Sequence, residues 1–399
     1  MNNNFVHSMK LSGFLSFPQD SEEITFNPLN VIIGPNGSGK SNLIESFELL
    51  KATSGNFAAA IRDGGGPVEW LWKGGKKSSP ATIEAVIGPA RTKRNLRYCL
   101  TFDAVQQRVE VIDEAIEEVK PVNNKKDVFF YYRFNRGRPV INVREEFNFN
   151  NGDKYVERNL QRQSLAPDQS VLSQRKDPDL YPEVTWVGAQ FSSIQTFREW
   201  SIGRYASLRQ PQPADLPDDF LLPDGSNLAL VLNRIQHTDE RELNRLIKKF
   251  FPRFERLSTR VSGGSVQFYL HEAGLSSPIP PTRLSDGTIR FLALLAVLLA
   301  PTAPPLVCIE EPELGLHPDA LSAVADLLRD ASTRMQIAVT TQSDVLVSEL
   351  TECPDTVVVS ENVGSGTTLR RLDPEQLRFW LDKYRLGEIW RMGELGGNI

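Results

Sequence analysis

A glycine-rich stretch near the start of the chain constrains the fold more than any other part of the sequence. It follows the apolar residues 31–33, carries the pattern G-x-x-x-x-G-K-S over residues 34–41, and leads into residues 42–50, which can form a helix. Its glycines permit backbone conformations that a Cβ atom would forbid, so successive N–H groups can turn inward on an anion. The helix would point its positive end at the same place. We therefore predict a buried strand, a phosphate-binding loop and a helix, in that order.

Two side chains at the end of this loop extend the prediction to a nucleoside triphosphate. Lys40 supplies a full positive charge for the β- and γ-phosphates, and the Ser41 hydroxyl is placed to ligate Mg²⁺. The residues that we expect to bind the nucleotide here are Gly34, Pro35, Asn36, Gly37, Ser38, Gly39, Lys40, Ser41 and Asn42.

The composition is that of a globular protein, with 40% hydrophobic and 24% charged residues. A net charge of -5 weighs against nucleic-acid binding over the whole surface but leaves room for a local basic face. The three cysteines include no C-x-x-C pair, which argues against a zinc site or disulfides and fits a reducing cytosol. The apolar run at 291–300 is too short to span a bilayer and predicts a buried helix. We expect a cytoplasmic protein with no secretory signal.

A string of short β segments is expected around and after the phosphate loop. Residues 9–33 have the pattern of a hairpin leading into the strand before the loop. Further strands are expected at 82–87, 97–102, 108–112, 128–134 and 139–143. Together they predict an antiparallel sheet beside the nucleotide site.

The segment 144–179 is polar and is expected at the surface. It contains Gln174, for which two interpretations remain open. The glutamine either lies in a turn near Mg²⁺, as a metal ligand, or belongs to a capped surface turn.

Residues 190–250 are expected to be largely helical, with helices at 194–200, 227–234 and 239–250. The last of these has a basic face that can be either a solvated helix surface or a DNA-binding face. That face consists of Arg241, Arg245, Lys248 and Lys249. No heptad pattern is long enough for a coiled-coil arm.

A second decisive stretch is the acidic end of an apolar run at residues 305–313. Four apolar residues predict a buried strand, and Glu310 and Glu311 follow at its carboxyl end, where ligands of open α/β sheets bind. By order, Glu310 takes the metal role and Glu311 orients or deprotonates the attacking water. The alternative is a solvated acidic turn, and the phosphate loop in the same chain favours catalysis.

Upstream, residues 284–288 precede the apolar helix and offer a second anion-binding feature. Ser285 and Gly287 contribute a hydroxyl and bare N–H groups at a helix N-terminus, with Asp286 between them. The alternative is an ordinary helix cap. The position of the segment just before the acidic strand favours the anion-binding interpretation.

These motifs resemble those of an ABC-type ATPase. Residues 34–41 correspond to Walker A, 284–288 to the signature, 306–311 to Walker B, and 315–318 to the D-loop. The closest group is that of the RecF/SMC-like AAA ATPases, which stand alone or act with a nuclease or toxin in bacterial anti-phage and DNA-repair systems. Residues 209–211, 224–228 and 384–390 also resemble this group.

The resemblance implies an α/β fold: a P-loop ABC-type ATPase head with an antiparallel β subdomain and a helical insertion. We assign the core to residues 1–143 and 265–372, the insertion to 144–264 and a helical tail to 373–399. No nuclease acid cluster follows Walker B, so a nuclease would have to come from another chain.

The sequence departs from the family pattern at two places. The signature has Asp286 and Thr288 where the common form has Gly and Gln, and Gln342 stands where the family usually has His. A neutral glutamine can donate a hydrogen bond to the γ-phosphate, and we assign it a catalytic role with Lys40 and Glu311. Because it cannot carry a proton or a positive charge, hydrolysis is expected to be slow, with ATP acting more as a clamp than as fuel.

The resemblance also implies ATP and Mg²⁺ as cofactors and a head-to-tail homodimer or higher oligomer. Ser285 and Gly287 of one copy would close over the nucleotide on Walker A of the other. The leading hypothesis is a sensor or clamp, in anti-phage defence, that controls a partner effector such as a nuclease or toxin.

Two other functions stay open: an ATP-stabilised scaffold for a partner protein with little turnover, and a RecF-like DNA-binding ATPase of DNA repair. A basic patch is the candidate DNA contact, and a solvated strand edge is the alternative for it. The patch consists of Arg91, Lys93, Arg94, Arg97, Lys125 and Lys126.

Overall fold

The computed structural model describes residues 4–75, 79–90, 94–121, 127–135, 137–146, 154–362 and 364–397. The chain forms two compact units. The first holds the described residues of Met1–Ile194 and Val358–Arg371, and the second holds those of Gln195–Val357 and Leu372–Asn398. One boundary between the units lies at residues 194 and 195, within the segment 144–264 that the sequence predicted as one insertion.

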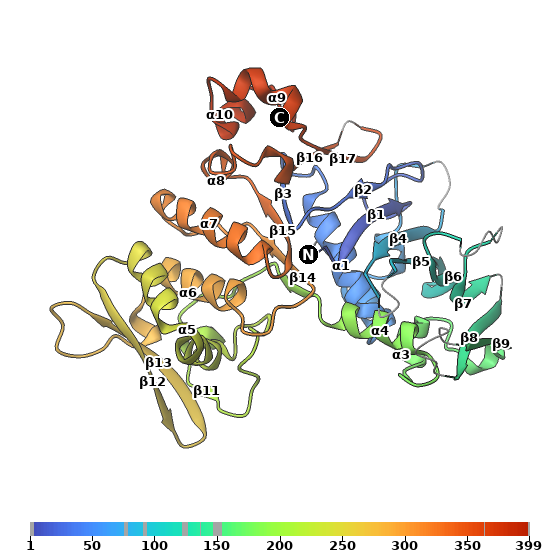
Figure 1. Cartoon of the computed structure of the whole chain (residues 1–399), viewed down its shortest axis with the longest axis horizontal. Helices are drawn as coiled ribbons and strands as arrows, with labels where there is room; N and C mark the ends of the chain where they lie inside the picture. Colours follow the sequence, from blue (N-terminus) through green and yellow to red (C-terminus); the bar gives the residue numbers. More distant parts are fainter. Residues whose placement is uncertain are drawn as a thin grey trace. The chain divides into compact units, whose positions relative to one another are not determined.

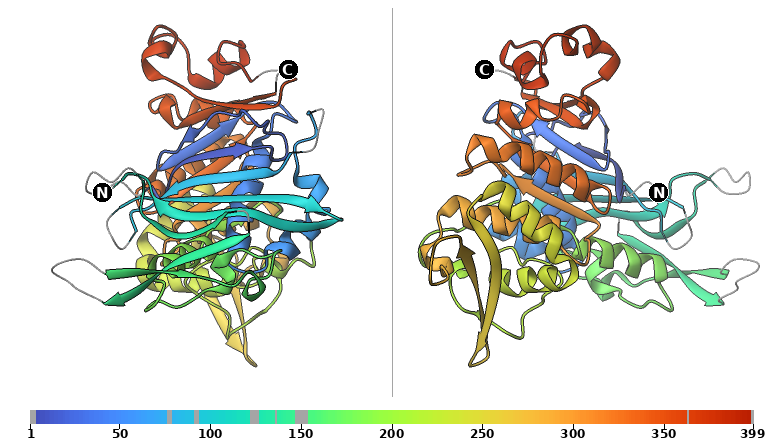
Figure 2. Two further views of the ribbon diagram at one scale, coloured as in Figure 1. Left: turned by 90° about the vertical axis from the view of Figure 1, so that its right-hand side faces the viewer. Right: turned by 60° about the vertical axis from the view of Figure 1, so that its left-hand side comes forward.

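An eight-stranded antiparallel sheet dominates the first unit (Figure 1). Its order is β2-β1-β4-β5-β6-β7-β8-β9, and Figure 2 shows the strands side by side, coloured from blue to green. The strands are β1 Val6–Ser12, β2 Ile24–Thr25, β4 Ala81–Ile87, β5 Leu96–Val105, β6 Arg108–Glu118, β7 Phe130–Asn135, β8 Arg138–Glu146 and β9 Lys154–Asn159. The predicted antiparallel sheet is confirmed. β9 was not predicted, because it is almost wholly exposed and lacks the apolar alternation that marks a half-buried strand.

The strand, loop and helix predicted around the glycines are confirmed. β3 (Leu29–Ile33) is buried at every residue, as expected of a strand covered on both faces. The helix α1 (Lys40–Thr53) follows, and β16 (Val357–Asn362) and β17 (Thr367–Arg371) come next to β3 in the sheet order. α1 packs against α2 (Phe57–Asp63) and against α4, whose bounds are Pro182–Ser192.

The second unit contains three parallel strands in the order β10-β14-β15. Its separate three-stranded sheet has the order β11-β13-β12 and packs against α5. The strands are β10 Gln195–Phe197, β14 Leu306–Glu310, β15 Gln336–Thr341, β11 Gln212–Pro213, β12 Phe254–Ser262 and β13 Ser265–Glu272. The helices are α5 Leu228–Phe250, α6 Asp286–Leu298, α7 Leu321–Ser332, α8 Asp344–Ser348, α9 Pro374–Leu381 and α10 Leu386–Arg391.

The predicted helix at 194–200 is wrong. Residues 195–197 form the strand β10, with Thr196 paired to Cys308 of β14 in parallel register. A short apolar run cannot be told from a helical turn by its periodicity, and here the pairing with a buried neighbouring strand decides. In this register, β10 ends beside the acidic end of β14.

The other two helices of that region are confirmed as two halves of α5. Asp239 has φ -149° and ψ 70°, which interrupts the helix between the two predicted segments. The Asp239 carboxylate then accepts a hydrogen bond from the Glu242 N–H at 3.1 Å, as a helix N-cap does.

The apolar run predicted as a buried helix is the main part of α6. Residues 291–298 are all buried, and the rings of Phe250 in α5 and Phe291 in α6 stack with their centroids 4.1 Å apart. Across the described ranges of the chain, no helix combines the length and the apolar character needed to cross a membrane.

A buried carboxylate fastens the sheet of the first unit to the helix α3 (Val171–Gln174). Glu114 on β6 is 1% exposed and accepts hydrogen bonds from the Tyr98 hydroxyl at 2.8 Å, from the Ser170 hydroxyl, and from the Val171 N–H at 2.9 Å. Burial raises the pKa of Glu114 from 4.5 to about 7, although these hydrogen bonds oppose the shift. The native state therefore holds a proton that the unfolded chain releases.

We predict that Glu114 makes stability fall as pH rises. Between pH 4.5 and 7 the folded protein binds more protons than the unfolded one, so its free energy of unfolding decreases across this window, by on the order of 3 kcal/mol. Urea unfolding at several pH values should show this decrease for the native protein and not for Glu114→Gln. The exposed Glu157→Gln on β9 is the control and should keep the native dependence. Parallel pH dependences for the native protein and Glu114→Gln would contradict the prediction.

Candidate nucleotide site

Two of the glycines in the phosphate loop, residues 34–41, are required by close backbone packing. Gly34 has φ 150°, and a Cβ there would lie 2.2 Å from the Ser360 carbonyl oxygen. Gly39 has φ 100°, and its Cβ would lie 2.1 Å from the Thr367 hydroxyl. Any other residue at either position would be strained and would displace the strand behind the loop.

Residues far along the chain hold this loop in place. The Ser360 hydroxyl of β16 donates to the Ser38 carbonyl at 2.8 Å, and the Thr367 hydroxyl of β17 lies 2.9 Å from the same oxygen. Ser16 lies 2.7 Å from Thr367 and accepts a hydrogen bond from the Asn42 amide, also at 2.7 Å. Nothing in the spacing of Ser16, Ser360 and Thr367 connects them to the glycine motif, so the sequence does not predict their role.

The interior of the loop fits an anion. Lys40 is 7% exposed, and its ammonium group donates to the Gly34 carbonyl at 2.7 Å and to the Pro35 carbonyl at 2.9 Å. The Ser38 hydroxyl is buried, and no described residue pairs with it. Asn36 and Ser41 are exposed. A phosphate group could accept hydrogen bonds from the buried lysine ammonium and from the Ser38 hydroxyl, which has no partner among the described residues.

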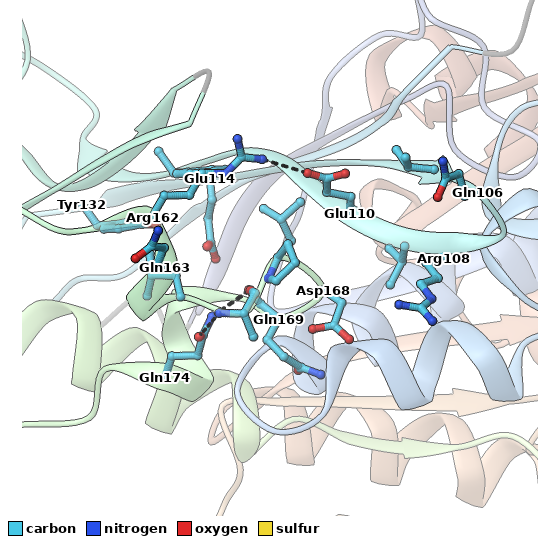
Figure 3. Close-up of a pocket in the computed structure, with 17 residues that line it drawn as sticks. Gln106, Arg108, Glu110, Glu114, Tyr132, Arg162, Gln163, Asp168, Gln169 and Gln174 are labelled. Atoms are coloured by element: carbon cyan, nitrogen blue, oxygen red, sulfur yellow. Dashed lines mark hydrogen bonds and ion pairs between the residues drawn. The ribbon is translucent and has the colours of Figure 1, made fainter.

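Gln174 has contacts that favour the surface-turn interpretation. Its amide oxygen accepts from the Ala166 N–H at 2.7 Å, and its amide nitrogen donates to the Gln169 carbonyl at 3.0 Å. These bonds close the segment 162–169 over a cavity of about 890 Å³ beside β6 and β7 (Figure 3). The side chain thus holds a turn of the first unit.

The acidic turn, residues 310–313, lies at the carboxyl end of β14 in the second unit. Glu311 has φ 44°, a left-handed conformation that is uncommon for a residue with a side chain, and its N–H donates to the Thr340 carbonyl at 2.9 Å. Arg198, directly after β10, places its Nε 3.3 Å from Oε1 of Glu310. Arg198 was not among the predicted site residues, because a helix was predicted over residues 194–200.

A hydrogen-bonded chain links the acidic turn to the end of β15. Glu313 accepts from the Thr341 hydroxyl at 2.6 Å and from the Gln342 N–H at 2.9 Å. The Gln342 side chain donates in turn to Oε1 of Glu311. Burial raises the pKa of Glu313. The two residues predicted to act on the γ-phosphate, Glu311 and Gln342, are therefore in direct contact.

The signature segment, residues 284–288, begins α6 and is held by a buried arginine. Ser285 caps the helix by accepting from the Thr288 N–H at 3.1 Å. Arg209, which is 3% exposed, donates to the Leu284 carbonyl at 2.7 Å and to the Asp286 carboxylate. A Cβ on Gly287 would lie 2.7 Å from the carbonyl of Gly315 in the predicted D-loop. The segment is therefore held rigidly, with a neutralised acid at its tip.

A family model described as "AAA domain, putative AbiEii toxin, Type IV TA system" matches residues 29–348, a range that includes the phosphate loop, the signature segment and the acidic turn. The chain belongs to this AAA family.

Two crystal structures of SMC heads share the fold of this AAA protein. The first, SmcHead bound to the C-winged helix domain of ScpA, is 16% identical, with a TM-score of 0.53 over 94% of this chain and 99% of that one. The second is a Smc head domain with an extended coiled coil, bound to the C-terminal domain of ScpA, from Pyrococcus furiosus. It is 14% identical, with a TM-score of 0.50 over 95% and 99% of the two chains. No curated protein matches the sequence. The expected P-loop ABC-type head is confirmed.

The AAA chain should bind ATP less tightly when the support behind its phosphate loop is removed. Thr367→Val deletes the hydroxyl that lies 2.9 Å from the Ser38 carbonyl. One lost hydrogen bond of about 1 kcal/mol corresponds to about fivefold weaker binding. Thr368→Val, on the exposed side of the same strand, is the matched control and should bind like the native protein. Titration with a fluorescent ATP analogue measures the affinity of both variants. An affinity of Thr367→Val equal to that of the native protein would contradict a role for Thr367 in ATP binding.

Proposed function

We propose that this protein binds ATP with Mg²⁺ and hydrolyses it slowly. The phosphate loop carries the proposal, because it holds the buried Lys40 ammonium and contains the buried Ser38 hydroxyl, which has no partner among the residues that the structure describes. In this proposal the phosphates of the nucleotide lie at this loop. The N–H groups of residues 34–41 and the ammonium of Lys40 then bind the phosphates.

Ser41 and Glu310 are the proposed metal ligands. Among the residues that the structure describes, no three His, Cys, Asp or Glu side chains gather as a metal site. Mg²⁺ takes few protein ligands and completes its shell with water and phosphate oxygens, so two protein ligands would suffice. Mg²⁺ would supply charge neutralisation at the β- and γ-phosphates. Arg198 now pairs with Glu310 and would give up that contact when the carboxylate turns to the metal.

Glu311 is the proposed base for the attacking water, and Gln342 is its partner. The amide of Gln342 already donates to Glu311, which supports a role in orienting the carboxylate. A glutamine cannot supply a positive charge to the transition state, so we expect slow turnover and a long-lived ATP state. Rapid turnover that Gln342→Ala leaves unchanged would count against this role.

We further propose that two copies close head to tail over the nucleotide. Ser285, Asp286 and Gly287 of one copy would cap the phosphates held by the other copy. The pairing of Asp286 with Arg209 supports this, because an unpaired carboxylate at that tip would repel the nucleotide. ATP then binds the closed state more tightly than the open state and shifts the population towards it.

The closed dimer is proposed to control a partner effector, a nuclease or toxin from another chain, in anti-phage defence. Two observations support a protein partner: the family description names a toxin system, and the two similar SMC heads were solved bound to domains of ScpA. The alternative function, a scaffold for a partner protein in which ATP is mostly structural, differs from this proposal only because it requires no hydrolysis.

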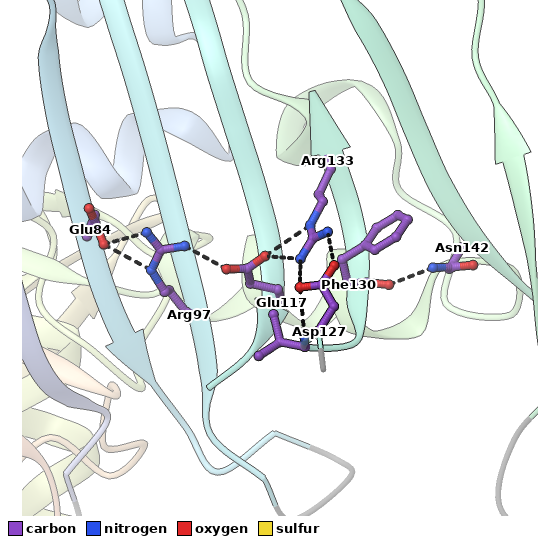
Figure 4. A network of polar contacts seen from close by, with 8 residues as sticks. Glu84, Arg97, Glu117, Asp127, Phe130, Arg133 and Asn142 are labelled. Carbon is purple, nitrogen blue, oxygen red and sulfur yellow. Dashed lines mark hydrogen bonds and ion pairs between the residues drawn. The ribbon is translucent and has the colours of Figure 1, made fainter. Parts of the chain in front are cut away.

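The proposed DNA contact has weaker support. Arg91, Lys93, Lys125 and Lys126 lie outside the described residues. Arg97 is paired with Glu84 and Glu117, which also holds Arg133 (Figure 4). Arg94 pairs with Glu118 in the same way. These glutamates neutralise the described part of the patch and favour a solvated strand edge.

Hydrolysis rates with and without duplex DNA separate the remaining functions. Measured across a salt series, a DNA clamp shows a rate that responds to DNA and loses the response steeply as salt increases. A scaffold for a protein partner shows no such response. We expect a hydrolysis rate that does not respond to DNA.

The dimer proposal predicts that Glu311→Gln slows hydrolysis by about a hundredfold or more and accumulates a dimer with ATP and Mg²⁺. Loss of the base stalls the closed state before the γ-phosphate is released. Light scattering coupled to size exclusion measures the molar mass with and without ATP. Lys40→Ala is the control and should not respond to ATP. A monomer for Glu311→Gln at saturating ATP would refute the head-to-tail arrangement.

A further inference from the structure

We infer that Glu313 is a positioning residue that sets the orientation of Glu311 through Gln342. This inference rests on the proposed ATPase function and assigns a role to a third acid that lies beyond the Walker B pair. Its basis is the chain of contacts from Glu313 to Gln342 to Glu311 within the second unit.

The first link of this chain fixes residue 342. One oxygen of Glu313, Oε1, accepts from both the Thr341 hydroxyl and the Gln342 N–H, at 2.6 and 2.9 Å. Both groups lie at the end of β15, beyond Thr340, which is the last residue of β15 in the register with β14. A carboxylate bonded to a hydroxyl and a backbone N–H is a strong and directional anchor.

The second link fixes the reacting carboxylate. Gln342 donates to Oε1 of Glu311, and no described residue donates to Oε2, which leaves that oxygen to accept a proton from water. The Glu311 backbone is held in its left-handed conformation by the Thr340 carbonyl and by the Leu314 N–H, which donates to the Glu311 carbonyl at 3.1 Å. With the backbone set in this way, Gln342 decides where the carboxylate points.

The environment of Glu313 argues for a functional rather than a packing role. Its second oxygen, Oε2, is buried and has no partner in the described chain, and the same holds for Nε of the nearby Arg290. A buried polar atom without a hydrogen bond is a cost that an apolar side chain of similar size would avoid. Only a hydrogen-bond acceptor at this position can anchor Thr341 and Gln342.

Two variants test the anchor, and exchange of backbone hydrogens reads it without hydrolysis. In Glu313→Ala the peptide that contains residues 341–343 should exchange faster in the absence of nucleotide, because the Gln342 N–H loses its acceptor. Thr341→Val removes the hydroxyl that donates to Glu313 and accepts from the Ser343 N–H at 3.0 Å, but it keeps the acceptor of the Gln342 N–H. Exchange at the Gln342 amide should therefore rise less in this variant than in Glu313→Ala. The exposed Glu352→Ala in the same unit is the control and should exchange like the native protein.

Kinetics then separate positioning from structure. Glu313→Ala should lower kcat by about ten- to a hundredfold, with the dissociation constant for ATP changed less than about twofold, because a displaced carboxylate affects the reaction and not the binding. Glu313→Gln should recover most of the rate, since its amide oxygen can accept the same two hydrogen bonds.

The outcomes distinguish this inference from the proposed function. If the native protein binds ATP but hydrolyses none, the ATPase proposal fails, and the exchange data still decide whether Glu313 anchors Gln342. If the native protein hydrolyses ATP and Glu313→Ala matches it in kcat and exchange, the inference alone is overturned. Should Glu313→Ala fail to fold, the exchange and kcat of Thr341→Val decide, and native values would overturn it.

Discussion

The hydrogen bonds to the Ser38 carbonyl are the interactions on which the phosphate loop depends. A chain of positive-φ glycines gains no stability from its own side chains and loses more conformational freedom than any other sequence when it is ordered. Ser360 and Thr367 supply the missing order from β16 and β17, and their backbone and side chains occupy the space that Cβ atoms would need at Gly34 and Gly39. The loop is thus held by β16 and β17, a strand pair more than 300 residues away in sequence that packs against it. Because the loop is already ordered, its N–H groups can bind an anion at a smaller entropic cost.

The charged groups around the proposed nucleotide site share a second property. Lys40 is bonded to the carbonyls of its own loop, Glu310 to Arg198, and Asp286 to Arg209. Each charge is compensated inside its own unit, as the buried Lys40 and the largely buried Glu310 require. A triphosphate and its metal ion would therefore exchange existing partners for new ones rather than create interactions from nothing. Such an exchange could favour one conformation over another, because Arg198 would lose its contact with Glu310 only in the proposed liganded state.

The sequence predicts contiguous features well and distant pairings poorly. The phosphate loop, the acidic strand and the buried helix α6 follow from local rules: glycine conformations, an apolar run of strand length, and a helix too short for a membrane. Even the break in α5 at Asp239 is visible as two separate periodic segments. β10 and Arg198 are not, because a three-residue strand acquires its identity only by pairing with β14. Ser16, Ser360 and Thr367 are likewise ordinary polar residues until the fold brings them to the loop.

Gln342, at the position where the resemblance to ABC-type ATPases implies a histidine, is best understood from Glu311 and Glu313, which both contact it. A protonated imidazole between Glu311 and Glu313 would form ion pairs with both, and these would hold the pKa of the ring high and bind the acids tightly. The glutamine amide instead forms one hydrogen bond to Glu311 and leaves the backbone N–H to Glu313, without any charge. Neutral hydrogen bonds are weaker and more easily exchanged than charge-assisted ones. The acidic turn is therefore held by hydrogen bonds within its own unit but offers no positive charge at residue 342, and this combination fits the proposed slow hydrolysis.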